Sequence, residues 1–291
     1  MLLGMMKNIS YFLYKIIFFV DSVLKKLIGK SFLLFFKDFI HNDSYKSINI
    51  LDKNITFFTP NQILEWRVNT FFTKEPETLV WIDGFKKEDK IIFWDIGANI
   101  GLYSIYATLK HPNIEVVSFE PSTSNLRVLS RNISINNLEE RIKINQLPLT
   151  RKENQYLTLE ESEFIEGWAM NTFGEGLDFE GKRIISKNKY KVLGTNINYL
   201  LKNNILEIPD YIKIDVDGIE HLILEGADNY LGNKKIKSLS IEINENFLEQ
   251  HESILKVMKK FNFKMKHKKH SSLTQNSKKF SKSFNYIFER V

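Results

Sequence analysis

The sequence predicts an α/β fold in which a mostly parallel sheet carries helices on both faces and follows an N-terminal helical segment. Short, continuous apolar runs such as Ile91–Trp94 are typical of strands that are covered on both sides. Helix-length segments alternate with these runs, as expected for a parallel sheet. The composition is that of an ordinary globular protein, with 43% hydrophobic residues, 13 Gly and 6 Pro among 291 residues.

Cysteine content and charge distribution narrow the function classes. The absence of Cys excludes a disulfide scaffold, a thiolate zinc site, an iron–sulfur cluster and a cysteine nucleophile. The net charge is +6, with +4 on residues 1–46 and +10 on residues 256–291, so the middle of the chain carries about −8. A basic body would indicate nucleic acid. Basic ends on an acidic body predict contact with an anionic surface outside the active centre, and no nucleic-acid partner.

Residues 1–46 predict one or two basic amphipathic helices that are broken near Gly29. The apolar runs Tyr11–Val20 and Ser31–Ile40 are interrupted by charges. Each run is about half of the roughly 20 residues that span a bilayer, so a transmembrane helix is not expected. No small-residue cleavage site of a secretory signal follows the first run. The helices either pack on the body or lie in a membrane interface with Lys toward acidic headgroups. The expected location is therefore cytoplasmic, with peripheral contact at the inner face of the membrane as the open alternative.

Residues 47–90 are expected to form an N-terminal cap on the body. Ile48–Leu51 and Ile55–Phe58 indicate a short hairpin, and Pro76 predicts the first turn of a helix that contains Leu79.

Residues 91–291 carry the strand–helix alternation, with residues 150–194 as a polar, glycine-containing insertion of strands and loops. Strands are expected at Ile91–Trp94, Glu115–Phe119, Arg141–Gln146, Tyr211–Ile214, Ser238–Ile243 and Phe284–Phe288. Helices are expected at Leu102–Lys110, Ser124–Asn136, Glu220–Tyr230 and Phe247–Phe261.

The turn after the first body strand is the first candidate site, because parallel sheets bind ligands beyond the carboxyl ends of their strands. Its candidate cofactor-binding residues are Asp95, Gly97, Ala98, Asn99 and Gly101. The two glycines allow a sharp turn and close approach of the backbone to a ligand. Their spacing differs from the G-x-G-x-x-G that binds a pyrophosphate. The leading acid disfavours a diphosphate and favours an ammonium or sulfonium ligand, and S-adenosylmethionine carries both groups.

Glu120 ends the second strand, 19 residues after Gly101. A carboxylate there can accept hydrogen bonds from both ribose hydroxyls of an adenosine, a geometry that serves NAD and S-adenosylmethionine alike. A helix-capping or surface position is the structural alternative.

The segment after the fourth strand, Lys213 to His221, holds the candidate catalytic residues Asp215, Glu220 and His221. Three carboxylates and an imidazole fall within seven residues at a strand end, which is costly to maintain without a use. Asp215 lies between two apolar residues and is expected to turn inward. A solvated turn with Glu220 capping the next helix is the alternative.

Glu242 lies between two Ile residues at the end of the fifth strand, so we expect a partly buried carboxylate. Asp215 and Glu242 would face each other across the mouth of the cleft and share the role of base. Alternatively they would hold a divalent cation with Asp217 or Asn244 as further ligands, a reading that we do not favour.

The insertion contains a glycine-bounded segment, Gly167–Gly174, with Trp168 and Asn171 inside it. It predicts either a wall for a sugar acceptor or a β-turn packed on the body. His267 and His270 are expected in a solvated basic tail. No P-loop, H-E-x-x-H or G-x-S-x-G motif occurs, which argues against ATPases, zincins and α/β-hydrolases.

Together these residues resemble the FkbM family of S-adenosylmethionine-dependent methyltransferases. The matching stretches are Phe93–Ser104, Ser118–Pro121 with Asn132 and Asn136, Ile212–Glu220 with Leu224, Gly226 and Ala227, and the strand of Glu242. The resemblance implies a class I methyltransferase (Rossmann-like) fold and methylation of a hydroxyl oxygen, commonly on a sugar or polyketide. Asp217 stands where the family usually has Glu, and Pro148-Leu149 stands near a usual Ala. The first 46 residues lie outside the resemblance.

The predicted reaction is an in-line O-methyl transfer, for which the protein aligns the acceptor and removes its proton. Asp95 and the glycine turn would bind the methionyl end of S-adenosylmethionine, and Glu120 its ribose. Asp215 would be the base, ahead of Glu220 or His221. A sugar in a lipid-linked or capsular glycan would be the acceptor, which places the chain in polysaccharide biosynthesis. The alternatives are an NAD-type oxidoreductase and a catalytically inactive membrane-peripheral binding protein.

Overall fold

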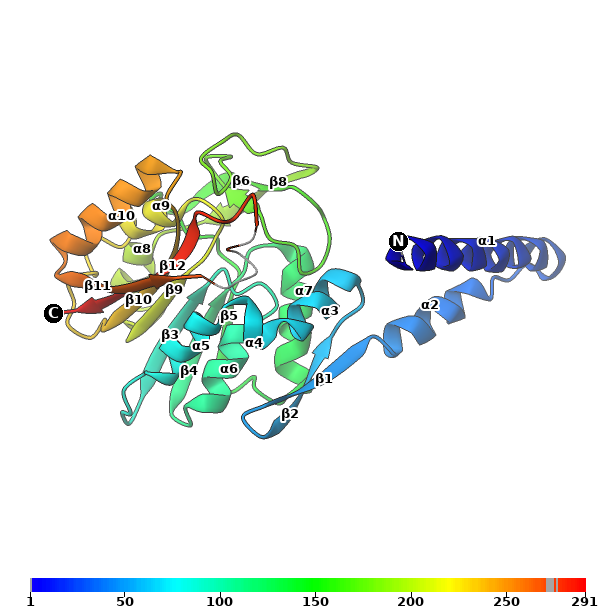
Figure 1. The fold of residues 1–291 in the computed structure, drawn as a ribbon, viewed down its shortest axis with the longest axis horizontal. Helices are drawn as coiled ribbons and strands as arrows, with labels where there is room; N and C mark the ends of the chain where they lie inside the picture. Colours follow the sequence, from blue (N-terminus) through cyan, green and yellow to red (C-terminus); the bar gives the residue numbers. More distant parts are fainter. Residues whose placement is uncertain (1, 271–274, 276) are drawn as a thin grey trace. The chain divides into compact units, whose positions relative to one another are not determined.

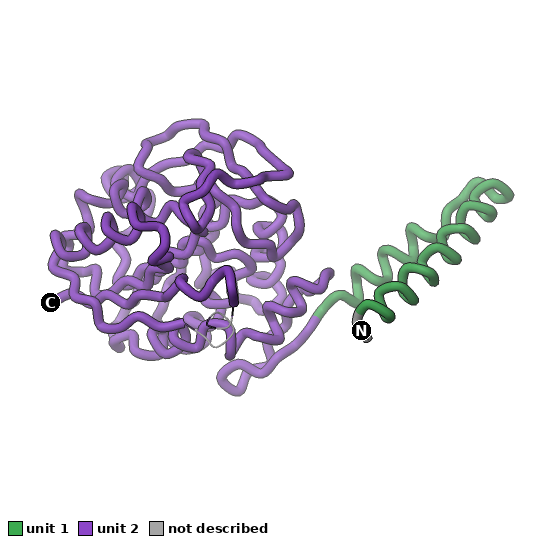
Figure 2. The backbone as a smooth tube through the Cα atoms, turned by 45° about the horizontal axis from the view of Figure 1, so that its top comes forward, with its two compact units in different colours: residues 1–45 green, residues 46–291 purple. Residues whose placement is uncertain are grey.

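The computed structural model describes residues 2–270, 275 and 277–291, and the chain divides into two compact units (Figure 2). Unit 1 comprises residues 1–45 and unit 2 comprises residues 46–291. The boundary falls beside residue 46, where the helical segment is predicted to end.

Unit 1 is a helical hairpin of α1 (Leu2–Ile28) and α2 (Leu33–Asn42). The predicted break near Gly29 is confirmed, and its positive φ of 69° is a conformation that glycine adopts readily. The Asp21 carboxylate accepts hydrogen bonds from the Ser31 hydroxyl, at 2.8 Å, and from the Leu33 N–H, at 3.0 Å. A side chain of α1 thereby caps the start of α2. No helix within the described ranges combines the length and the apolar character that crossing a bilayer requires.

Unit 2 begins with the predicted hairpin, β1 (Tyr45–Ile50) and β2 (Lys53–Phe58). The turn between them uses two residues with positive φ, Leu51 and Asp52. Three short helices follow: α3 (Gln62–Asn69), α4 (Phe71–Lys74) and α5 (Pro76–Asp83). The Asn61 side chain accepts the Leu64 N–H and so begins α3, and Pro76 begins α5 as predicted.

Two asparagines hold β2 against the body: one lies in α7 (Thr123–Ile135) and the other is the C-cap residue of that helix. The Thr56 N–H donates to Asn136 Oδ1 at 3.0 Å, and the Phe58 N–H donates to Asn132 Oδ1 at 2.9 Å. β2 is an edge strand, so no neighbouring strand accepts these N–H groups. The two asparagine side chains accept them instead.

The body is built on a seven-stranded sheet in the order β11-β12-β10-β9-β3-β4-β5 (Figure 1). Its strands are β3 (Ile91–Ile96), β4 (Ile114–Phe119), β5 (Ile142–Asn145), β9 (Tyr211–Ile214), β10 (Ser238–Asn244), β11 (Phe263–Lys269) and β12 (Ser283–Arg290). From β10 to β5 the neighbours are parallel, whereas β12 pairs antiparallel with β10 and with β11. The predicted α/β fold with a mostly parallel sheet is confirmed.

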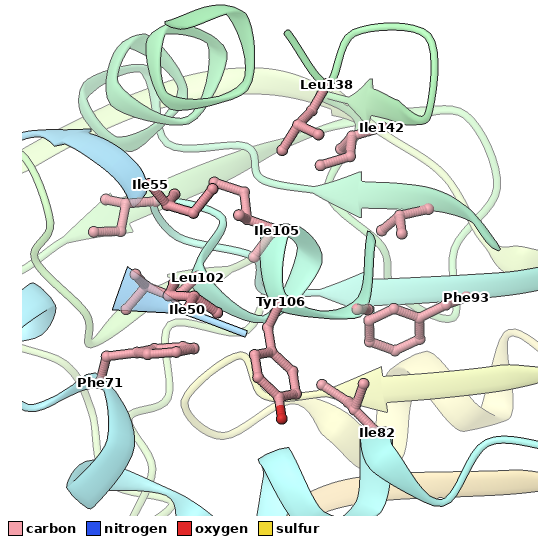
Figure 3. Close-up of a cluster of buried hydrophobic side chains, with 14 of the residues drawn as sticks. Ile50, Ile55, Phe71, Ile82, Phe93, Leu102, Ile105, Tyr106, Leu138 and Ile142 are labelled. Atoms are coloured by element: carbon pink, nitrogen blue, oxygen red, sulfur yellow. The ribbon is translucent and has the colours of Figure 1, made fainter. Parts of the chain in front are cut away.

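Each face of the sheet has its own apolar core, because successive side chains of a strand point to opposite faces. Ile91 and Phe93 of β3 join the core that contains residues of α5, α6 (Leu102–Lys110) and α7, part of which is drawn in Figure 3. Ile92 and Trp94 join the second core with α8 (Ile197–Lys202), α9 (Glu220–Glu225) and α10 (Leu248–Lys260). Helices on both faces explain why β3 is a continuous apolar run.

The insertion between residues 150 and 194 forms a small antiparallel sheet in the order β7-β6-β8. Its strands are β6 (Gln155–Glu161), β7 (Asn171–Phe173) and β8 (Asn188–Gly194). Leu159 and Phe173 of this sheet are buried with Ile219 and Leu222 of the body.

The structure differs from the sequence-based prediction around His267, at the end of one helix and at one further helix. The basic tail around His267 is largely exposed, as predicted, but it forms a strand, β11, that pairs along β12 at the edge of the sheet. The helix expected to reach Tyr230 ends at Glu225. Gly226 follows it, and a Cβ there would lie 2.4 Å from the Thr150 carbonyl oxygen. Helix α8 was not predicted.

Candidate active site

A cavity of about 610 Å³ lies beyond the carboxyl ends of β3, β4, β9 and β10. Its volume is typical of small-molecule sites, which span roughly 300–1,000 Å³. The wall includes Gly97, Glu120 and Asp215, which directly follow β3, β4 and β9, and Glu242, which lies near the end of β10. The edge of the sheet at which the sequence predicts a site is therefore hollow.

The glycine turn is required for a reason other than the predicted approach to a ligand. Gly97 has a φ of 86°, and a Cβ on it would lie 1.8 Å from the Asp215 carbonyl oxygen. Gly101 has a φ of 85°, and its Cβ would lie 2.6 Å from Leu129 Cδ1. Both glycines thus permit the left-handed backbone and close packing against the body. Gly97 also lines the cavity.

Glu120 and Asn99 lie together at the wall of the cavity. The Glu120 carboxylate accepts the Asn99 N–H and the Ser122 N–H, each at 2.8 Å. Each oxygen keeps a second lone-pair direction for another donor. Burial raises the pKa of Glu120 to about 8, although these N–H bonds oppose the shift. Glu120 is thus placed to accept hydroxyl hydrogen bonds from a nucleoside ribose.

Asp95, Ala98 and Gly101 do not line the cavity, although the sequence places them with Gly97, Asn99 and Glu120 as cofactor-binding residues. Asp95 is fully buried and accepts the Ser104 hydroxyl at 2.6 Å through Oδ2. Its Oδ1 is buried without a hydrogen-bond partner among the described residues, and burial raises the pKa of this carboxyl. In this structure Asp95 supports the turn from behind.

The insertion supplies one wall of the cavity. Residues 167–173 all line it, so the segment is a wall and not merely a turn packed elsewhere on the body. The Trp168 carbonyl accepts the side-chain amides of Asn99 and Asn125, each at 3.0 Å. The Met170 N–H donates to Asp217 Oδ2 at 2.6 Å. These bonds fix the wall to the glycine turn and to the loop after β9.

Asp215 has one oxygen held and one oxygen available. The fully buried Lys213 Nζ donates to Asp215 Oδ2 at 2.6 Å, and Oδ1 has no partner within the described part of the chain. Burial would lower the pKa of Lys213, but Asp215 and Glu75 outweigh burial and raise it. Lys213 is therefore a permanent cation behind the cavity wall.

The two neighbouring carboxyls hold protons more tightly than usual. Burial and the Asp215 charge raise the pKa of Asp217 to about 6 and that of Glu242 well above its usual range. Asp215, Asp217 and Glu242 all line the cavity, as the sequence predicts for Asp215 and Glu242. Burial is the larger cause, and the neighbouring carboxylates add to it because ionising one carboxyl disfavours the next.

The helices before the body add cations that the sequence did not identify. Arg67 of α3 and Lys74 of α4 line the cavity, and Lys74 Nζ lies 2.5 Å from Glu75 Oε1. Burial alone would raise the pKa of Glu75, but Lys74 and Lys213 lower it to about 2. Arg67 donates its Nε–H to the Gly167 carbonyl at 2.5 Å.

Glu220 and His221, the other two candidate catalytic residues, do not line the cavity. The Glu220 carboxylate accepts the Val216 N–H at 2.9 Å and the Gln250 side-chain amide at 2.5 Å. It therefore shapes the loop that presents Asp215. His221 is buried against Phe247, with its Nδ1 unpartnered among the described residues. The geometry favours Asp215 for contact with a substrate, and the catalytic roles of the other two stay predictions.

The structure offers no obvious cation site around these carboxylates. Within the described ranges, no group of three or more His, Asp or Glu side chains is arranged to hold a metal ion. Asn244, a ligand in the alternative reading, donates its side-chain amide to the Phe179 carbonyl at 3.0 Å and accepts the Asn246 N–H.

Sequence reasoning missed three groups of cavity residues: Arg67 and Lys74, Glu75 with Glu77, and His270 with Asn285. His270 stacks on Phe284 with ring centroids 4.2 Å apart. The alternation of Phe263, Met265 and His267 with Lys is a strand signal that would have predicted β11 and so placed His270 at a strand end.

One family model matches more than half of the chain. The family model described as "Methyltransferase FkbM domain" matches residues 95–265. Methyltransferase sdnD of Sordaria araneosa is 30% identical over 155 residues, which cover 46% of this chain and 59% of that protein. The match therefore spans less than two thirds of that relative.

Among solved structures, a methyltransferase FkbM from Methylobacillus flagellatus is 14% identical with a TM-score of 0.49, covering 78% of this chain and 52% of that chain. TYW2 of P. horikoshii in complex with MeSAdo is 10% identical with a TM-score of 0.45, covering 85% of this chain and 70% of that chain.

Proposed function

The chain belongs to the FkbM methyltransferase family, and from this premise we propose that it transfers a methyl group from S-adenosylmethionine to a hydroxyl oxygen. The observation that carries the proposal is one cavity whose lining includes Glu120, Asn99 and Gly97 together with Asp215. One set of residues suits a nucleoside and the other suits a proton transfer. A group-transfer enzyme needs both in one cavity.

The residues present fit the donor. Glu120 keeps lone pairs for two ribose hydroxyls, and Asn99 Oδ1 is a buried acceptor without a partner among the described residues. Asp215, Asp217 and Glu75 line the same cavity as Gly97. These charges favour a cationic ligand and disfavour a diphosphate. When bound, S-adenosylmethionine supplies a methyl group on a positively charged sulfur.

Asp215 is the residue to which we assign removal of the acceptor proton. Its Oδ1 has no partner within the described part of the chain, and Lys213 holds the other oxygen, so the direction of the carboxylate is fixed. The acceptor O–H would donate its proton to Oδ1, which would make its oxygen a stronger nucleophile toward the methyl group that a bound donor would supply. Glu242 is the alternative acceptor of this proton, because it faces the same cavity.

We assign the acceptor to the hydroxyls of a sugar in a cell-surface glycan or glycolipid. The lining of the cavity includes Trp66 and Trp168 together with Asn171 and Asn285. Aromatic faces pack against sugar rings, and amide groups bind hydroxyls. This combination supports a polyhydroxylated acceptor.

Labelled methyl transfer from S-adenosylmethionine tests the proposal. The acceptors are the polysaccharide and lipid fractions of cells that lack this chain. Asp215→Asn should lower incorporation by about 100-fold or more, the usual contribution of a positioned base, while S-adenosylhomocysteine still binds. Retained turnover in Asp215→Asn contradicts the role of Asp215, and no incorporation by the wild-type chain contradicts the proposed acceptors.

A further inference from the structure

The strongest unexplained group in the cavity is the guanidinium of Arg67, which lies outside the matched domain. Arg67 is 9% exposed and lines the cavity. A guanidinium carries five N–H donors, and among the described residues Nε–H alone has a hydrogen-bond partner, the Gly167 carbonyl. No carboxylate lies within ion-pair distance of Arg67 among the described residues, although Asp217, Glu75 and Asp215 act on it from further away. A buried cation without a direct partner is costly unless a ligand supplies one.

The position of Arg67 indicates which ligand atoms it meets. Arg67 holds the Gly167 carbonyl, and the next carbonyl, that of Trp168, accepts the Asn99 side chain of the glycine turn. Arg67 and the glycine turn therefore hold neighbouring carbonyls of the same wall. Each of the three nearby acids has a partner other than Arg67: Asp217 has Met170, Asp215 has Lys213 and Glu75 has Lys74.

The geometry points to Arg67 as the residue that binds the methionyl carboxylate of the donor. A planar fork of N–H donors matches a carboxylate with two parallel hydrogen bonds. This inference rests on the proposed function, because it requires that the cavity takes S-adenosylmethionine. It assigns a binding role to α3, a helix that precedes the matched residues 95–265.

Calorimetric titration with two ligands tests this role without a turnover assay. S-adenosylhomocysteine carries the amino-acid carboxylate, and 5′-methylthioadenosine lacks it. Arg67→Met should weaken S-adenosylhomocysteine binding by about tenfold or more and leave methylthioadenosine binding within about twofold. Arg127→Met is the matched control, since Arg127 is an exposed residue of α7 that pairs with Glu166 at 3.2 Å and does not line the cavity.

The outcomes separate the inference from the function. Equal losses for both ligands would show that Arg67 only holds Gly167, and unchanged affinity for S-adenosylhomocysteine would show that the fork binds nothing on the donor. Either result overturns the assignment while the proposed function stands. A wild-type chain that binds neither ligand overturns both. Arg67→Lys, which keeps the charge and loses the fork, should fall between wild type and Arg67→Met.

A separate observation concerns the surface of unit 1. The apolar side chains of α1 repeat at intervals of three and four residues, which places them on one face of a helix that turns about 100° per residue. All members of this face are exposed: Met5, Ile9, Phe12, Ile16, Val20, Val23 and Leu27. Those of α2 are exposed as well: Leu34, Phe35, Phe36, Phe39 and Ile40. An apolar surface of this extent is typical of an interaction site.

The charges of α1 lie on the opposite face. By the same helical geometry, Lys7, Lys15, Lys25 and Lys26 fall within about a 100° sector that faces away from Ile9 and Leu27. The acid of this helix, Asp21, is 7% exposed and is occupied by Ser31 and Leu33. The charges on this face are therefore all positive, and the exposed aromatic side chains of Tyr11 and Phe18 lie in the same sector.

We infer that unit 1 lies in the interface of an anionic membrane, with the apolar face of α1 among the acyl chains. A helix with a continuous apolar face and a lysine-bearing polar face binds in the plane of such a surface. Lys side chains reach from the interface toward acidic headgroups while their stems cover apolar surface. Charge complementarity favours this occupant over a second copy of the chain, whose polar face would carry the same sign.

Vesicle flotation of the full-length chain tests this inference. The vesicles are phosphatidylcholine alone and phosphatidylcholine mixed in equal parts with phosphatidylglycerol. The chain should float with the anionic vesicles, and Ile16→Gln/Val20→Gln should weaken this binding by about tenfold or more. Asn8→Gln/Ser22→Gln is the control: it also introduces two Gln residues, but on the polar face, and it should bind like wild type.

Two results would contradict the membrane inference. The chain would fail to float with anionic vesicles while sedimenting as a dimer that Ile16→Gln/Val20→Gln dissociates, which would assign the face to a second copy. Alternatively both double variants would bind equally well, which would show that the apolar face is not the contact.

Discussion

The cavity of unit 2 and the hairpin of unit 1 distribute charge and hydrocarbon in opposite ways. Around the cavity, Asp95, Lys213 and Glu220 are buried, and each has hydrogen-bond or ion-pair partners. On the hairpin, apolar side chains such as Phe12, at 65% exposed, and Leu27, at 77% exposed, face outward. Burying a charged group costs free energy, which its hydrogen-bond and ion-pair partners must offset. Exposing an apolar side chain to water also costs free energy, which is regained when the side chain is buried in a binding contact.

The difference teaches where each region obtains its stability. The cavity depends on tight packing between β3 and β9, so a small added group should disrupt it. In the hairpin, Asp21 caps the start of α2, and few apolar side chains are buried. Its apolar surface therefore contributes little to folding stability and remains available for binding.

The largest effect is expected from Gly97→Ala in the glycine turn. The added Cβ would meet the Asp215 carbonyl oxygen at 1.8 Å, and the φ of 86° strains any residue with a Cβ. Unfolding free energy should fall by about 3 kcal/mol or more, measured by urea denaturation. Gly232→Ala is the control, since its Cβ would meet Phe261 Cδ1 at an ordinary 3.6 Å. Equal stability of the two variants would remove the packing argument for the cavity.

A smaller effect is expected from pH. Burial raises the pKa values of Glu120, Glu220 and Asp217 to about 8, 7 and 6, above the ordinary values of about 4. At a pH between the ordinary pKa and the raised pKa, each of these carboxyls is protonated in the folded chain and ionised in the unfolded chain. The free energy of unfolding should therefore fall as pH rises from 5 to about 8. Urea midpoints across this range measure the slope.

Glu120→Gln should reduce that pH slope, by on the order of 1–3 kcal/mol across the range, whatever its effect on stability at any single pH. Glu139→Gln, at an exposed position of the body, should keep the wild-type slope. A slope that survives in Glu120→Gln would mean that the carboxyl ionises normally in the folded chain.

The smallest effect should come from removing the hydrogen bonds by which Asp21 of α1 holds the start of α2. Asp21→Ala removes the acceptor of the Leu33 N–H and the Ser31 hydroxyl. Amide hydrogen exchange should accelerate near the start of α2 and remain unchanged in β3 and β9, because α2 and the two strands belong to different compact units. Faster exchange in both regions would contradict the independence of the hairpin.

The body strands and the glycine turn could be predicted because their signals are local. A continuous apolar run such as Ile91–Trp94 fits only a strand covered on both faces, and the residues after such strands must meet at one sheet edge. The order of neighbouring motifs carried the family resemblance, which the match to residues 95–265 confirms.

Other parts of the site depend on tertiary packing that leaves no local signal. Arg67 has the sequence surroundings of an ordinary surface residue on a short helix, and only the packing of α3 against the insertion brings it to the cavity. Glu220 was expected to be catalytic because carboxylates cluster near it. Its actual partners, Val216 and Gln250, are set by the loop and by α10.

The central claim is that the cavity beside Gly97 and Glu120 binds a sulfonium donor and not a dinucleotide. Titration calorimetry of the wild-type chain with S-adenosylhomocysteine and, separately, with NADH tests this claim most directly. The account predicts saturable binding of S-adenosylhomocysteine that Glu120→Ala weakens, and no saturable binding of NADH. Saturable binding of NADH with none of S-adenosylhomocysteine would contradict it.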